Sequence, residues 1–240
     1  MASISQLTDG ERNFTKFVLL NFKVSPDIAR RYFDGMFPPT QLAQMVNSRM
    51  QAIISLQKSK RINAAQMEIL RGVPGTMWPP YLSSMPVGTK VTSSKDFDLS
   101  LMICLLRNIG GLLTPSNGWD HLPHPNDMLP GAHLATLKWY RNQLAHTTVT
   151  SMDENEFTDK WVGVEKALTS LNNGQRPHEV TDILDLDLDG EIAKTVANAE
   201  LKQIKKEYLD CEKEKEQIES DFSFYREGNL PKNIAGLCNF

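Results

Sequence analysis

The chain has 240 residues and a formal net charge of -3, and 40% of its residues are hydrophobic and 23% charged. This length and balance suffice for one sizeable hydrophobic core with an appendage, and they exclude a chain that is disordered throughout. Proteins that hold RNA over a broad electrostatic surface are usually basic. The negative net charge therefore implies that any contact with RNA is local.

The first two turns of the chain carry charged side chains, at Asp9, Glu11, Arg12 and Lys16. They leave no room for the apolar core of a signal peptide, and no later apolar run approaches the length of a membrane span. We therefore expect a cytoplasmic protein that does not enter a membrane.

The first half of the chain is predicted to form helices separated by proline and glycine. Apolar periodicity favours a helix over 9–22. Ser25 and Pro26 then resemble an N-cap followed by a proline in the first helical position. That second helix is predicted to end at about Phe37, before two prolines, and further helices are predicted over 40–56 and 63–70.

The second half is predicted to hold the core, after a long surface loop over 72–95. Residues 98–109 are apolar almost all round, as in a central buried helix. After a second loop, over 110–131, a helix with Leu134, Leu137 and Leu144 on its apolar face is predicted. Two alternative capping boxes, at Ser151 with Glu154 and at Asp153 with Glu156, open the next helix. Its apolar seam is formed by Phe157, Trp161, Val164, Leu168 and Leu171, and Asn172, Asn173 and Gly174 end it.

Beyond Gly190 the chain becomes highly charged, and residues 191–225 have apolar side chains at mostly heptad spacing. Two arrangements fit this pattern: a long projecting helix that forms a coiled coil, and a solvated helix that folds back along the bundle. We predict three parts: a helical domain over 1–188, a long charged helix over 189–227, and a linker or tail over 228–240.

The most informative segment is residues 141–146, which combines Arg141, Asn142 and His146. Arginine offers a planar donor fork that matches phosphate oxygens. Histidine can both accept and donate a proton near neutral pH. Attack of a 2'-hydroxyl on the adjacent phosphate needs both functions and requires no metal ion. The alternative is that both side chains only stabilise a helix C-terminus.

Helix geometry limits what one copy of this motif can do. Asn142 and His146 are four residues apart and share a helix face. Arg141 and His146 converge only if the helix ends near Ala145, and the β-branched residues that follow favour an end there.

The motif and its surroundings resemble the HEPN domains, which are all-helical modules, many of them metal-independent endoribonucleases. The segments that carry the resemblance are Phe33-Asp34, Phe37-Pro38-Pro39, Lys95 to Leu101, Leu105 to Ile109, Gly118-Trp119-Asp120, and Trp139 to Asn142 followed by His146. They are similar to the HEPN subgroup of DAZ-interacting RNA-binding ubiquitin ligases, over roughly Leu7 to Leu188. The resemblance implies an all-α, HEPN-like helical bundle with long loops. The four residues between Arg141 and His146 are at the short end of the family's range.

Two further patterns could serve the motif or RNA. A compact basic cluster, Lys58, Lys60 and Arg61, is either an RNA phosphate contact or a solvated helix end. The pair Arg107-Asn108 repeats the first two residues of the motif without a histidine. It is expected to satisfy buried carbonyls or to support the motif.

No cofactor or metal site is expected. The cysteines, Cys104, Cys211 and Cys238, lack the spacing of a disulfide framework or zinc finger. His121, His124 and His133 match no familiar zinc site. Residues 185–190 imitate the start of an EF-hand loop, but Val196 stands where that loop needs a glutamate.

Two classes of function follow. In the first, two protomers form a homodimer in which Arg141, Asn142 and His146 of both copies line one cleft, and the dimer binds and cleaves single-stranded RNA. In the second, the chain is a non-catalytic module for interaction or oligomerisation within a larger signalling or ubiquitin-ligase protein. No array of Cys and His typical of a RING domain occurs in this stretch.

Overall fold

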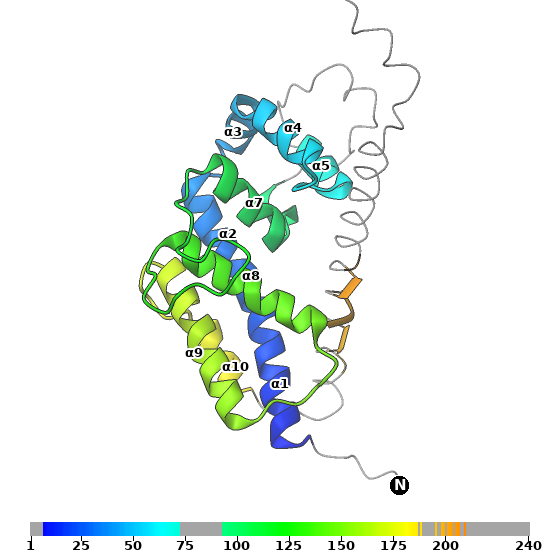
Figure 1. Ribbon diagram of the computed structural model, residues 1–240, viewed down its shortest axis with the longest axis vertical. Coiled ribbons are helices and arrows are strands. Elements are labelled where there is room, and N and C mark those ends of the chain that lie inside the picture. Colours follow the sequence, from blue (N-terminus) through cyan, green and yellow to red (C-terminus); the bar gives the residue numbers. More distant parts are fainter. Residues whose placement is uncertain are drawn as a thin grey trace, which may run out of the picture.

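The computed structural model describes residues 7–72 and 93–186, and some positions between 188 and 209. All regular structure in these residues is helical, as predicted (Figure 1). The α-helices are α1 (Asp9–Leu19), α2 (Ser25–Met36), α3 (Leu42–Ser48), α4 (Met50–Lys58), α5 (Ala64–Arg71), α7 (Leu99–Ile109), α8 (Pro130–His146), α9 (Glu154–Leu171) and α10 (His178–Leu184). None of the described helices has the length and apolar character needed to cross a membrane.

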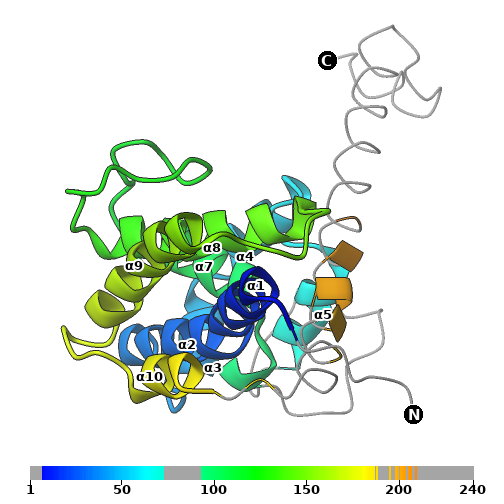
Figure 2. The same ribbon diagram turned by 90° about the horizontal axis from the view of Figure 1, so that it is seen from below.

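A long rod built from α1 and α2 is the axis of the bundle. Helices α8 and α9 lie together on one side of this rod, and α10 lies on the other (Figure 2). Helices α3, α4 and α5 form one end of the molecule, at the top of Figure 1, and the start of α1 lies at the opposite end. The core therefore runs along the rod, where α7, α8 and α9 cover it.

The predicted break between the first two helices is wrong, because the backbone stays helical from α1 to α2. A five-residue π-helix, η1 (Leu20–Val24), joins them. The amide of Ser25 donates to the carbonyl of Leu20, and the Ser25 hydroxyl donates to the same oxygen at 3.2 Å. Pro26 has no amide hydrogen and its ring crowds the carbonyl four residues earlier. The wider π-turn before it accommodates the proline without a break.

The single helix predicted over 40–56 is also wrong in detail. The structure has two helices, α3 and α4, with a kink at Arg49, whose φ of -112° and ψ of 14° lie outside helical values. The hydroxyl of Ser48 donates to the carbonyl of Met45 at 3.0 Å, and such bonds compete with the helical ladder. Helix α5 begins and ends within one residue of its prediction, with Asn63 as its N-cap.

The predicted core helix is confirmed as α7, which begins after the N-cap Asp98. Its buried residues are Leu99, Leu101, Met102, Ile103, Leu105 and Leu106. The structure adds a stripe that the apolar pattern did not predict. Ser100, Cys104, Arg107 and Asn108 are only partly buried. Helix α7 is therefore open to solvent along one edge.

Helix α9 has the predicted apolar seam, and Phe157, Trp161, Val164, Leu168 and Leu171 are all buried. Of the two alternative caps, the structure selects Asp153, whose carboxylate accepts from the amide of Glu156 at 2.9 Å. Gly174, at φ +77°, follows the end of the helix.

Helix α10 was not predicted from the sequence, although Val180 and Ile183 are buried at helical spacing. The loop expected over 72–95 ends in a short 3-10 turn, η2 (Ser94–Asp96), and its residues 73–92 lie outside the described residues. Most of the predicted helix over 191–225 and all of the tail over 228–240 lie outside them as well, as do half of the positions of the EF-hand-like stretch over 185–190.

Candidate functional site

The motif occupies the last two turns of α8. Pro130 starts this helix without losing a hydrogen bond, because the first amides of a helix have no partner within it. His146 is the last helical residue and is exposed, whereas Asn142, one turn earlier, is partly buried. The two side chains are about 40° apart around the axis, as four residues of helix require. An amide and an imidazole therefore share one accessible face.

Arg141 lies on a different face of α8. The helix ends near Ala145, as expected, with His146 as its last residue. The five-residue step from Arg141 to His146 is therefore fully helical, which places them about 140° apart around the axis. The guanidinium of Arg141 donates to the Ser100 hydroxyl at 3.0 Å, and so faces α7. Although the helix ends near the expected residue, His146 is still helical, so Arg141 and His146 lie on different faces of α8 within one chain.

The open edge of α7 receives this arginine. Ser100, Cys104 and Asn108 recur at four-residue spacing and line up along the helix. Asn108 donates to the carbonyl of Cys104 at 2.7 Å. The Arg107 guanidinium lies 5.4 Å from the ring centroid of Trp119, a cation-π distance. The Arg107-Asn108 pair was expected to satisfy buried carbonyls or to support the motif, and the carbonyl that Asn108 contacts is only partly buried. Of the motif residues, Arg141 contacts α7 at Ser100, two helical turns before Asn108.

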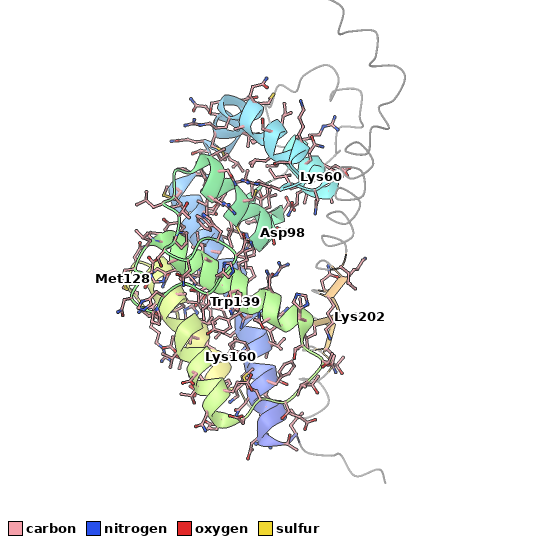
Figure 3. The ribbon with its side chains drawn as sticks, viewed as in Figure 1. Lys60, Asp98, Met128, Trp139, Lys160 and Lys202 are labelled. Atoms are coloured by element: carbon pink, nitrogen blue, oxygen red, sulfur yellow. The ribbon has the colours of Figure 1, made fainter. Side chains whose placement is uncertain are left out.

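The basic cluster reaches the same edge from the other side. Lys58 ends α4, and Lys60 has a left-handed φ of 57° in the turn before α5 (Figure 3). Arg61 donates to the side-chain oxygen of Asn108 at 3.2 Å, and the Cys104 thiol donates to the Arg61 carbonyl at 3.5 Å. All three basic residues are exposed. The turn thus fixes Arg61 against α7.

Cys104 reports on the electrostatics of this edge. Burial raises the pKa of its thiol, while Arg107, Arg61 and Lys138 and a hydrogen bond from Asn108 act in the opposite direction. Lys138, on α8, also forms an ion pair with Asp120 at 2.6 Å. Three cations from different parts of the chain therefore act on one position of α7.

The sequence analysis did not single out the polar residues along the open edge of α7, or Lys138 on α8, as parts of a site. The signal was present, because Ser100, Cys104 and Asn108 interrupt an otherwise apolar helix at four-residue spacing. Lys138 precedes Arg141 by three residues and so occupies a neighbouring position on α8. These residues do not belong to the Arg-His motif, so a search for that motif passes over them.

The three histidines considered as zinc ligands have different environments. His133 is buried on α8, whereas His121 and His124 are exposed in the preceding loop. Burial, the largest cause, lowers the pKa of His133, and Lys166 acts in the same direction. Among residues 7–72 and 93–186 and the positions described beyond them, no three His, Cys, Asp or Glu side chains are grouped so that they could hold a metal ion.

Comparison with known proteins identifies two similar ubiquitin ligases. The chain is 25% identical over 150 residues to the E3 ubiquitin-protein ligase DZIP3 of Mus musculus, which covers 62% of this chain and 12% of the relative. It is 25% identical over 146 residues to the Homo sapiens E3 ubiquitin-protein ligase DZIP3, covering 60% of this chain and 11% of the relative. The matched region is thus a small part of those proteins. No solved structure matches the chain significantly.

The profile of one protein family matches residues 39–196, which is more than half of the chain. The family is described as "DZIP3/ hRUL138-like HEPN". The matched range includes α7, α8 and α9, and with them the motif and the open edge of α7. The all-helical fold agrees with this match, and the chain belongs to the DZIP3/hRUL138-like group of HEPN domains.

Proposed function

We propose that the chain is an RNA-binding HEPN module that acts as a homodimer and cleaves single-stranded RNA without a metal ion. One observation carries the proposal: Asn142 and His146 share an accessible face at the end of α8, next to the turn that holds Arg141. A residue that served only the core would be sealed in. An accessible amide and imidazole, together with a guanidinium supplied by a second copy of the chain, are the groups that a phosphate ligand needs.

The proposed dimer follows from the geometry of α8. Arg141 and His146 of one chain diverge by about 140° around the helix, so they do not grip one phosphate together. A second copy whose α8 faces the first would supply its own Arg141 opposite His146. The cleft would then contain two copies of each side chain, and each scissile phosphate would meet groups from both protomers.

The proposed chemistry is transesterification. His146 of one protomer takes the proton from a 2'-hydroxyl, and the resulting oxygen attacks the adjacent phosphorus. The bond from phosphorus to the 5'-oxygen breaks, and the leaving oxygen takes a proton from the second His146. Arg141 holds the charge that builds on the phosphoryl oxygens, and Asn142 orients the phosphate or the imidazole. The products are a 2',3'-cyclic phosphate and a free 5'-hydroxyl.

A second function, a non-catalytic interaction module, is favoured by a different observation. Arg141 already donates to Ser100 within its own chain. That bond suits a structural arginine that ties α8 to α7. The matched relatives are ubiquitin ligases of which the chain spans 12% or less, so the module would act inside a larger protein. In this case the exposed Lys58, Lys60 and Arg61 could still contact RNA, but no cleavage would occur.

One experiment separates the two functions. A single-stranded RNA is incubated with the wild-type chain, with His146→Ala and with His121→Ala, all in excess chelator. His121 is an exposed histidine in the loop before α8, so His121→Ala is the matched control. We expect cleavage by the wild type and the control and none by His146→Ala.

Cyclic phosphate termini, detected by mass spectrometry, would identify the mechanism. Equal cleavage by His146→Ala, or loss of all cleavage in chelator, would overturn it. A folded dimer that binds RNA and leaves it intact would establish the non-catalytic module instead. Light scattering measures the dimer directly, and a strictly monomeric chain at high concentration would remove the composite cleft.

A further inference from the structure

The motif is one end of a longer row of cations that the fold assembles along the open edge of α7. Arg141 contacts Ser100 at the start of this edge. Arg61 contacts Asn108 at its end, at 3.2 Å. Arg107 belongs to the edge itself, and Lys138, on α8, acts electrostatically on Cys104, midway between the two ends. We call these four residues, Arg61, Arg107, Lys138 and Arg141, the cationic strip.

The four cations come from three separate segments of the chain: the turn before α5, α7 and α8. The contacts of Cys104 place three of them near the middle of the edge, because Arg61 contacts its thiol through a backbone carbonyl and Arg107 and Lys138 act on it electrostatically. Such a grouping is unexpected in a chain whose net charge is -3. Like charges repel one another, so a group of cations interacts most favourably when a bound anion lies among them and offsets this repulsion.

The length of the strip suits a nucleic-acid strand. From Ser100 to Asn108 the helix rises about 12 Å, at 1.5 Å per residue. A strand with the ~3.4 Å rise of a stacked duplex advances three to four nucleotides over that distance. A single phosphate would satisfy one or two of the cations and leave the others unused. A row of phosphates along a polymer matches the whole strip.

Two acidic residues near the strip, Asp120 and Asp98, already have partners. Asp120 pairs with Lys138, but its side chain is 70% exposed, and an exposed ion pair of this kind is weak enough for a phosphate to compete with it. Asp98 lies at the start of α7, where its carboxylate accepts from the side chain of Gln66 and from the amide of Leu101. The hydroxyl of Ser100, the thiol of Cys104 and the amide of Asn108 complete the edge with polar groups.

We propose that the cationic strip holds the sugar-phosphate backbone of a single RNA strand and leads it to the motif on α8. This inference rests on the proposed RNA-binding function and extends it, because it assigns Arg107 and Lys138 to RNA binding and gives the strand a path. The strand would lie along the edge of α7, with Arg141 at the end where the path meets the motif.

The test compares two lysines with matched surroundings. Lys138 pairs with Asp120 at 2.6 Å and its side chain is 28% exposed, whereas Lys160, on α9, pairs with Glu156 at 2.6 Å and is 31% exposed. Binding of a fluorescent oligouridine to the full chain is measured by anisotropy across a salt series, for the wild type, Lys138→Gln and Lys160→Gln. Each phosphate contact with a single strand contributes about -0.7 to the slope of log K against log salt.

We expect Lys138→Gln to make the slope less steep by about 0.7 and to weaken binding severalfold, since one phosphate contact is lost. Lys160→Gln should match the wild type. Arg107→Gln should behave like Lys138→Gln, and Arg107→Lys, which keeps the charge, should restore the slope. Thermal melts establish that each variant is folded, and the charge-keeping variant separates lost charge from lost packing on Trp119.

Alkylation of Cys104, followed by peptide mass spectrometry, gives an independent readout. Bound oligouridine should slow the reaction of this thiol in the wild type, because the strand covers the edge of α7. Unchanged reactivity at saturating RNA would contradict the path.

The outcomes also separate this inference from the proposed function. A wild type that binds no RNA overturns both. A wild type that binds RNA, with Lys138→Gln equal to Lys160→Gln in affinity and slope, overturns the strip alone. Competition by polyglutamate as effective as that by oligouridine would identify an acidic protein segment as the ligand and would likewise overturn the strip as an RNA site.

Discussion

The two halves of α8 have opposite surroundings. The first half, Gly131 to Leu137, is buried except at Thr136, whereas the second half, Lys138 to His146, is buried only at Leu144 and Ala145. The first half packs against the loop that contains Trp119, and α9 contacts the helix as far along as Tyr140, whose ring lies next to Gly163. The second half carries the motif and Lys138, which belongs to the cationic strip. One continuous helix therefore has an anchored part and an open part.

The difference shows how the fold can hold polar side chains in place without burying them. A short helix in water is only marginally stable, and packing of its apolar face provides most of its stability. The anchored half of α8 fixes the axis, and the open half extends from it as a rigid continuation. Substitutions in or around the anchored half should therefore change stability, and substitutions in the open half should change binding.

The largest expected effect is a loss of stability when a core residue of α9, the helix that packs against α8, is truncated. Trp161, on α9, is 4% exposed, and its ring centroid lies 5.2 Å from that of Phe157. We expect Trp161→Ala to lower the free energy of unfolding by about 3 to 5 kcal/mol, because of the cavity it leaves. The neighbouring Val162 is 59% exposed, and Val162→Ala should change stability by less than about 0.5 kcal/mol. Urea denaturation measures both, and equal midpoints would show that Trp161 is not part of the core.

A smaller effect is expected at Gly131, in the anchored half. A Cβ atom there would lie 2.5 Å from the carbonyl oxygen of Leu113 and 3.1 Å from the ring of Trp119. We expect Gly131→Ala to cost about 1 to 3 kcal/mol through overpacking, despite the better helix propensity of alanine.

Gly35, in α2, is the control, because a methyl group at this position would meet no atom of the described residues within 4 Å. Gly35→Ala should be stabilising by about 0.5 to 1 kcal/mol. Thermal unfolding distinguishes the two variants, and a Gly131→Ala chain as stable as the wild type would mean that α8 does not pack closely against that loop.

The smallest effect is a dependence of stability on pH that the anchored half should show. His133 is 6% exposed, and burial lowers its pKa below the ordinary value of 6.5. Between the folded and unfolded pKa values the unfolded state binds more protons, so the free energy of unfolding rises with pH. The stabilisation from neutral His133 is complete above about pH 6.5 and is lost as the pH falls through the folded pKa.

Melting temperatures of the wild type and His133→Gln between neutral and mildly acidic pH measure this effect. The wild type should lose more stability on acidification than His133→Gln, and His121→Gln, which alters an exposed histidine, should follow the wild type. Parallel curves for all three proteins would show that His133 does not titrate differently in the folded state.

The sequence predicted the features that depend on local apolar pattern. It did not predict the features that depend on individual backbone hydrogen bonds or on contacts between distant segments. The apolar periodicity of α7, α8 and α9 identified the core, because burial of one face dominates their stability. The π-helix before Pro26 and the kink at Arg49 escaped prediction, since each depends on which carbonyl a given amide reaches. The sequence also identified the motif. It did not predict that Arg141 faces α7 or that Arg61 and Lys138 meet there, because contacts between distant segments leave no periodic signal.

The central claim is that RNA contacts the open half of α8 and the adjoining edge of α7. The most direct test is photochemical cross-linking of a thiouridine-substituted single-stranded RNA to the chain, with the cross-linked residues mapped by mass spectrometry. The account predicts cross-links within 138–146, within the α7 edge from Ser100 to Asn108, and at Arg61. Cross-links confined to α9 or to the loop over 110–129, with none on the α7 edge or beyond Leu137 in α8, would contradict it.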